Sequence, residues 1–120
     1  YTLHGSSAAS DVYKRQIRQW CYRSHFLKLP AGGYFPPHRD KSWESIRLIL
    51  PLFNCNAPLT RFILEDKTLQ WELGRMYFVN TLKEHTLFNA SADQDSIWLV
   101  LNYIVNEESI NWIYRNLAIT

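Results

Sequence analysis

One short stretch of the sequence, His38-Arg39-Asp40, contains residue types typical of a metal site. Side chains two residues apart in an extended segment lie on the same face, so the imidazole and the carboxylate would project into one pocket. They are two of the three protein ligands in the two-histidine, one-carboxylate triad, which binds non-haem iron(II) and leaves coordination positions open. Alone the stretch is weak evidence, because two fixed residues often recur by chance.

His85 is the best candidate for the third ligand. It lies 47 positions after His38, in a short apolar segment that follows a glycine-containing turn. Strands distant in the sequence meet across the mouth of a β-sandwich, so His85 can complete a triad with His38 and Asp40. His4 lies in an atypical N-terminal segment, and we expect His25 to be a partly buried or surface histidine.

Arg47 stands near the start of the otherwise apolar run IRLILPLF, nine residues after His38. A guanidinium in such a strand must face either solvent or an anion, because an unpaired buried charge is costly. Its planar fork suits bidentate binding of a carboxylate, such as the far carboxylate of a 2-oxoglutarate co-substrate that chelates iron. Arg47 is therefore a candidate co-substrate ligand, with solvent exposure as the alternative.

Short β-strands are predicted to position these residues. The pattern of apolar runs and turn residues predicts extended segments at 24–29, 34–40, 46–53, 61–65, 68–72, 76–80, 85–89 and 97–105, and a helix at 109–117. Pro51 suggests that its segment is an edge strand or contains a bulge. We therefore predict an all-β domain, specifically a jelly roll or double-stranded β-helix whose two sheets close around a pocket, with a short C-terminal helix.

Length and composition are typical of one small domain. The chain has 120 residues and a net charge of +2, which does not indicate a nucleic-acid or membrane partner. It contains no apolar run of about 18 residues, and no secretory leader is recognised at its start. Cys21 and Cys55 are not closely spaced, so we expect structural thiols in a reducing compartment, the cytoplasm.

Several pieces of the chain, in order, resemble the aspartyl/asparaginyl β-hydroxylase-like family of iron(II)- and 2-oxoglutarate-dependent oxygenases. The resemblance covers roughly two thirds of the chain, from residue 31 to residue 105. The similar pieces are GGYFPPHRD (32–40), RLILPL (47–52), WELGRMYFVNT (71–81), EHTLFNAS (84–91) and WLVLN (98–102). The order and spacing of five pieces are far more specific than a single His-x-Asp stretch.

The resemblance implies that His38, Asp40 and His85 bind iron and act in catalysis, and that Arg47 helps to hold 2-oxoglutarate. Some members of the family have glycine in place of the carboxylate ligand. Members usually have a second arginine about ten residues after the distal histidine, where this chain has Gln94-Asp95-Ser96. Ser96 is the best match for this co-substrate position, and its hydroxyl supplies a hydrogen bond without a charge.

The N-terminal segment, residues 1–16, differs from the rest of the chain. Its string SSAASDVYKRQ resembles translated sequencing-adapter read-through, and we predict that it is not native. Residues 17–120 would then form an oxygenase core that lacks its N-terminal part. Such a core could leave a sheet face uncovered, which favours aggregation.

The predicted function is hydroxylation of an unactivated C–H by an iron(II)- and 2-oxoglutarate-dependent dioxygenase. The substrate would be a small molecule or a peptide, with an Asp or Asn residue or an amino-acid-like compound as examples. A catalytically inactive, metal-binding, cupin-like module is one alternative, favoured by Ser96. A zinc hydrolase with two histidines and one aspartate is another, but it needs a general base, and Glu84 would face away from His85 within a strand.

Overall fold

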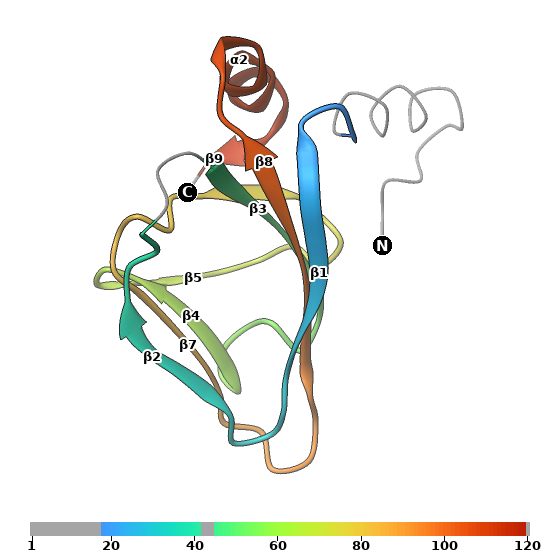
Figure 1. Cartoon of the computed structure of the whole chain (residues 1–120). Coiled ribbons are helices and arrows are strands. Elements are labelled where there is room, and N and C mark those ends of the chain that lie inside the picture. Colours follow the sequence, from blue (N-terminus) through green and yellow to red (C-terminus); the bar gives the residue numbers. More distant parts are fainter. Residues whose placement is uncertain (1–17, 42–44, 120) are drawn as a thin grey trace.

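The computed structural model describes residues 18–41 and 45–119, which form two facing β-sheets with a helix beyond one end (Figure 1). The N-terminal segment predicted at residues 1–16, together with its boundary, therefore lies outside the described residues. The elements in chain order are β1 Cys21–Leu29, β2 Tyr34–His38, β3 Ser45–Phe53, β4 Thr60–Leu64, β5 Lys67–Leu69, β6 Tyr77–Val79, β7 His85–Asn89, β8 Ser96–Ile104, α2 Glu107–Asn116 and β9 Ala118–Ile119.

The two sheets have the strand orders β1-β8-β3-β6-β9 and β2-β7-β4-β5. All pairs are antiparallel except β6 with β9. Consecutive strands alternate between the sheets over much of the chain, so strands distant in sequence become neighbours. This architecture confirms the predicted double-stranded β-helix, or jelly roll.

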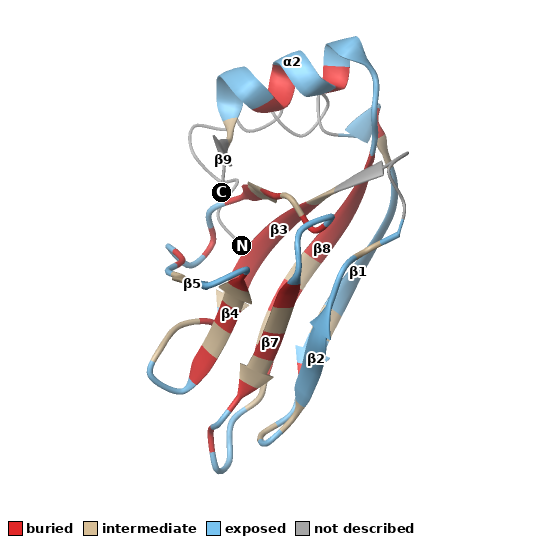
Figure 2. Ribbon diagram, turned by 90° about the vertical axis from the view of Figure 1, so that its left-hand side faces the viewer, coloured by how far each residue is buried: buried red, intermediate tan, exposed pale blue. Residues whose placement is uncertain are grey.

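Strand alternation divides the apolar residues into two clusters on opposite faces of the five-stranded sheet. The inner cluster lies between the sheets and contains Leu29, Ile49, Cys55, Phe62, Leu64, Trp71, Tyr77, Val79, Leu87 and Trp98. In β8, for example, Trp98 faces inward whereas Leu101 and Tyr103 face outward. Figure 2 shows that β3 and β8 are mostly buried, whereas β1 and β2 are mostly exposed.

The outer cluster lies beneath α2 and contains Trp20, Leu48, Leu50, Met76, Leu101, Tyr103, Trp112 and Ile113. The helix begins with a capping box, in which the Asn106 side chain accepts from the Ser109 backbone N–H and the Ser109 hydroxyl accepts from the Asn106 N–H. Trp112 and Ile113 of α2 join this cluster at one end of the sheet, so the helix covers only part of the face that was predicted to be uncovered. On β1 the outer face stays open, where Phe26 is 70% exposed.

Of two sequence predictions about local structure, the bulge at Pro51 is confirmed and the position of a turn needs correction. Pro51 does coincide with a register shift between Pro51 and Phe53, but β3 is a central strand, paired with β8 and β6. A bulge accommodates the missing backbone N–H there without a free edge. The predicted β4–β5 turn at Asp66–Lys67 lies one residue earlier, at Glu65–Asp66, where Glu65 has a φ of 56°.

Cys21 and Cys55 are both free thiols. Burial raises the pKa of the Cys55 thiol, whose Sγ donates to the carbonyl oxygens of Phe53 and Ile97 at 3.3 and 3.2 Å. A protonated, buried thiol of this kind is a packing group. Within the described parts of the chain, no helix has the length and apolar character needed to cross a membrane.

Candidate metal centre

Pairing of β2 with β7 brings the two candidate histidines together. His38 is the last residue of β2, His85 is the first residue of β7, and the two lie opposite each other in the register. Their ring centroids are 4.3 Å apart. Asp40 follows the end of β2, and its backbone N–H donates to the Thr81 carbonyl at 2.9 Å. The carboxylate therefore reaches the site from a turn held by Thr81, and not by strand alternation as predicted.

Backbone carbonyl groups orient both imidazole rings. His38 Nδ1 lies 2.7 Å from the Pro36 oxygen, and His85 Nδ1 lies 2.8 Å from the Lys83 oxygen. A carbonyl oxygen can only accept, so each Nδ1 carries the proton, and in a neutral ring Nε2 then has a free lone pair. Histidine metal ligands in proteins commonly have this second hydrogen bond, which sets the tautomer and the ring orientation.

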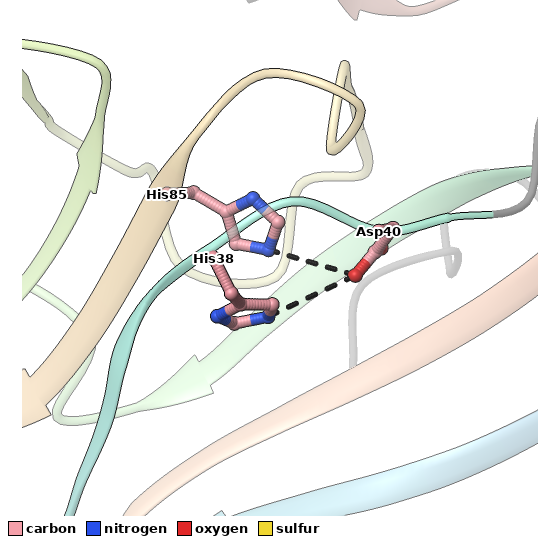
Figure 3. Close-up of side chains that lie close together, drawn as sticks. All are labelled: His38, Asp40 and His85. Carbon is pink, nitrogen blue, oxygen red and sulfur yellow. Dashed lines mark ion pairs between the residues drawn. The ribbon is translucent and has the colours of Figure 1, made fainter.

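The free Nε2 atoms converge on the carboxylate. Each lies 3.8 Å from Oδ1 of Asp40 (Figure 3). The ligand atoms of His38, Asp40 and His85 all lie within 4.8 Å of one another. Two neutral nitrogens and one anionic oxygen at this separation form a donor set that suits a divalent transition metal.

The second oxygen of the Asp40 carboxylate faces Arg47. Oδ2 lies 3.2 Å from Arg47 Nε. The contact is an ion pair without hydrogen-bond alignment, so this buried oxygen has no hydrogen-bond partner among the described residues. Buried charged oxygens usually have their hydrogen bonds satisfied. Oδ2 therefore faces the Arg47 cation, whereas Oδ1 faces the two histidine Nε2 atoms.

The triad stands at the boundary between core and solvent. The His85 side chain is 8% exposed, and its ring stacks on Phe62 at a centroid distance of 5.8 Å and an interplanar angle of 9°. The His38 side chain, by contrast, is 43% exposed. One ligand is thus held by the core, and another remains open to incoming molecules.

A cavity of about 290 Å³ extends from the two histidines into the space between the sheets. It is lined by His25, Leu27, Phe35, His38, Arg47, Ile49, Phe62, Thr81, His85, Leu87 and Val100. His25 is exposed, in agreement with the expected partly buried or surface histidine, and its side chain also forms part of this wall. Alternation with Leu27 and Leu29, both apolar, was the sequence signal that could have placed it on the inner face.

The two predicted co-substrate residues are not brought together. Arg47 lines the cavity, and Asn102 is its partner on β8. Ser96 lies six residues away from Asn102 at the other end of β8, or roughly 20 Å at about 3.3 Å per residue. Ser96 is fully buried, and its hydroxyl accepts a hydrogen bond from Trp98 Nε1 at 2.7 Å. This position does not support a co-substrate role for Ser96, and it indicates a packing role.

Comparison with known proteins identifies the family of this chain. The family model described as aspartyl/asparaginyl beta-hydroxylase matches residues 10–104. The chain belongs to the aspartyl/asparaginyl β-hydroxylase family. It is therefore a hydroxylase-family domain with a cluster of His38, Asp40 and His85 suited to a metal. The match begins inside the segment 1–16 that the sequence set apart. No curated protein matches this chain.

Solved structures align with this chain at low sequence identity. A predicted oxalate decarboxylase from Thermotoga maritima aligns with a TM-score of 0.54 and 16% identity, over 77% of this chain and 74% of that chain. A cupin 2 conserved barrel domain protein from Salinispora arenicola aligns with a TM-score of 0.46 and 8% identity, over 77% and 69% of the two chains. The first similarity supports the fold of this aspartyl/asparaginyl β-hydroxylase family member and nothing more specific.

Proposed function

We propose that this chain is an iron(II)- and 2-oxoglutarate-dependent dioxygenase that hydroxylates an unactivated C–H bond. The observation that carries the proposal is the convergence of two Nε2 lone pairs, from His38 and His85, with Asp40 beside an open cavity. The overall reaction is R–H + O₂ + 2-oxoglutarate → R–OH + succinate + CO₂. The substrate and 2-oxoglutarate each supply two of the four electrons that reduce dioxygen.

The three side chains would hold one face of the metal. His38 and His85 would provide Nε2, and Asp40 would provide Oδ1, so the protein would supply three ligands and further coordination positions would remain. Bound iron(II) supplies the activation of dioxygen, chemistry that protein side chains alone do not provide. The Pro36 and Lys83 carbonyl groups keep each ring in the tautomer that can bind.

Arg47 is the proposed cation for the co-substrate. It lies on the cavity wall, its side chain is 42% exposed, and its Nε is next to Asp40. From this place it can hold the Asp40 carboxylate in position and bind a second carboxylate that enters the cavity. The apolar walls formed by Ile49, Leu87 and Val100 would keep water away from the reacting atoms.

An anaerobic titration of the purified chain with iron(II) and 2-oxoglutarate tests the proposal. We expect the visible charge-transfer band of a metal-chelated oxo acid, and its absence in wild-type protein that binds iron would overturn the proposal. Arg47→Ala should weaken 2-oxoglutarate roughly ten- to a hundredfold, as expected for loss of a charge-assisted hydrogen bond, with a smaller change in iron affinity. Arg61→Ala, on the outward face of β4, is the matched control.

The zinc-hydrolase alternative has one observation in its favour, which is the presence of His25 in the cavity wall as a candidate general base. Glu84 is exposed and precedes β7, so it does not fill that role. Metal binding without the charge-transfer band, together with hydrolysis that is lost in His25→Ala, would favour this alternative. The cytoplasmic location and the absence of nucleic-acid and membrane partners remain predictions from composition.

A further inference from the structure

Strand register places a row of polar side chains across the inner face of the five-stranded sheet. Asn102 of β8 pairs with Arg23 of β1 on one side and with Arg47 of β3 on the other. Directly paired residues share a face of the sheet. Asn102 is on the inner face because it alternates with Val100, which lines the cavity. Arg23 and Arg47 therefore flank Asn102, in the row next to that of His25; Arg47 and His25 line the cavity, and Arg23 lies one row beyond His25.

A β-bulge determines that Arg23 faces inward. The β1–β8 register shifts between Cys21 and Arg23, which leaves Tyr22 as the extra residue. Cys21 packs on the outer cluster, whereas Leu29, which is in phase with Arg23, belongs to the inner cluster. In a regular strand without the bulge, Cys21 and Arg23 would share one face, because they are two residues apart. Bulges beside functional sites often redirect a side chain in this way.

Polarity falls in steps from this row toward the interior. The next row contains His25, Val100 and Ile49, all of which line the cavity. The following row contains Leu27 and Trp98. The wall opposite the metal ligands thus changes within three rows from charged, to mixed, to apolar. A ligand that matches this wall has a polar head at the mouth and an apolar chain inside.

The charged side chains near the mouth of the cavity indicate the sign and the number of the charges on the head group. Neighbouring strands are about 4.8 Å apart, so the Arg23 and Arg47 backbones are roughly 10 Å apart, and Arg23 is available for an anion other than the co-substrate that Arg47 would hold. Asp40 already neutralises part of the charge of Arg47 through their 3.2 Å contact. Arg23 therefore supplies about one excess positive charge at this edge, which suits a monoanion better than a dianion.

We propose that Arg23 and His25 select a small monocarboxylate substrate with an apolar chain. The carboxylate is held at the mouth by Arg23, with His25 as a hydrogen-bonding neighbour. The chain lies against Leu27, Ile49 and Val100, in a cavity whose volume of about 290 Å³ suits a small ligand. This assignment rests on the proposed function for the reaction, in which an apolar C–H inside the cavity becomes C–OH by the stoichiometry given above.

Isothermal titration with hexanoate, and with hexanamide as its neutral analogue, tests the assignment. The protein is loaded anaerobically with iron(II) and saturating 2-oxoglutarate, so that the co-substrate position is filled. We expect hexanoate to bind at least roughly tenfold more tightly than hexanamide, and Arg23→Gln to remove most of this preference. Arg61→Gln, which removes the same charge from an outward-facing position, should change hexanoate affinity by no more than about twofold because distant exposed charges are screened.

Two substitutions at His25 test its proposed hydrogen bond to the carboxylate. His25→Ala should weaken hexanoate several-fold, and His25→Gln, which keeps a hydrogen-bond donor, should recover part of the loss. Equal affinity for hexanoate and hexanamide would overturn the assignment, and so would an equal loss in Arg23→Gln and Arg61→Gln. Failure of hexanoate to bind wild-type protein that shows the 2-oxoglutarate band would also overturn it.

If the proposed oxygenase function is wrong, the same experiments give a different result from failure of the carboxylate site. In that case the charge-transfer band is absent, and the hexanoate titration is repeated with zinc(II) alone. Binding that depends on Arg23 would then support the carboxylate site independently of the oxygenase chemistry. Binding that is lost with the metal ligand His38 but unaffected by Arg23→Gln would place hexanoate on the metal and overturn the assignment.

Discussion

The two ends of the space between the sheets differ in the side chains that line them: one end has buried aromatic rings, and the other has partly exposed polar side chains. At the closed end, the indole of Trp98 packs edge-to-face on Trp71 at 5.4 Å, and Trp71 packs in the same manner on Phe62 at 5.5 Å. At the open end, His38 and Arg47 are each more than two-fifths exposed. One end thus resembles a protein core, and the other a functional surface.

Phe62 connects the two ends. Its ring lies against Trp71 and Trp98 on one side and stacks on His85 on the other. Rings that interlock in this way have few alternative rotamers, because the surrounding core is close-packed. The comparison teaches that the aromatic end supports the metal end, since the most buried ligand, His85, takes its orientation from the core.

Trp98→Ala should break this support and have the largest effect on stability. Removing a fully buried indole should lower the free energy of unfolding by about 3–5 kcal/mol, a large share of the stability of a small domain. Chemical denaturation measures the loss, and Trp98→Phe, which keeps a ring, should lose clearly less. A Trp98→Ala protein as stable as wild type would show that the closed end is not the supporting core.

His38→Ala should separate function from stability at the open end. We expect metal affinity to fall at least about a hundredfold, the upper end of what is lost when only a supporting hydrogen bond is removed. The melting temperature should hardly change, because the side chain is 43% exposed. Metal titration and thermal melting measure the two quantities. His25→Ala, in the same cavity but outside the triad, is the control, and an equal loss of metal affinity there would contradict the assigned ligand set.

Ser96→Ala should have the smallest effect and should affect only the closed end. The change leaves the buried Nε1 of Trp98 without its acceptor, which should cost about 1–3 kcal/mol of unfolding free energy. The affinity for 2-oxoglutarate, measured by the charge-transfer band, should be unchanged. A marked loss of co-substrate affinity with stability intact would restore the binding role that the sequence predicted for Ser96.

Local signals in the sequence were enough to predict most elements of this protein and the types of residue at its site. Turn residues and apolar runs are local signals, so β7, predicted at 85–89, is observed at His85–Asn89, and the predicted C-terminal helix is observed two residues earlier at its start. The five-piece resemblance predicted the family and drew attention to His38, Asp40 and His85. These conclusions need only the order and spacing of residues along the chain.

Tertiary structure alone decided which of these residues meet. The register of β2 on β7 sets His38 opposite His85, and the turn at Thr81 brings Asp40 to them. The register of β1 on β8 likewise puts His25 beside Val100 in the cavity wall, and Ser96 lies at the far end of β8. Cross-strand pairing joins positions tens of residues apart, and burial depends on what covers a side chain from another element. Neither the pairing of distant strands nor the burial of a side chain can be read from a local sequence pattern, because both are set only when the sheets pack.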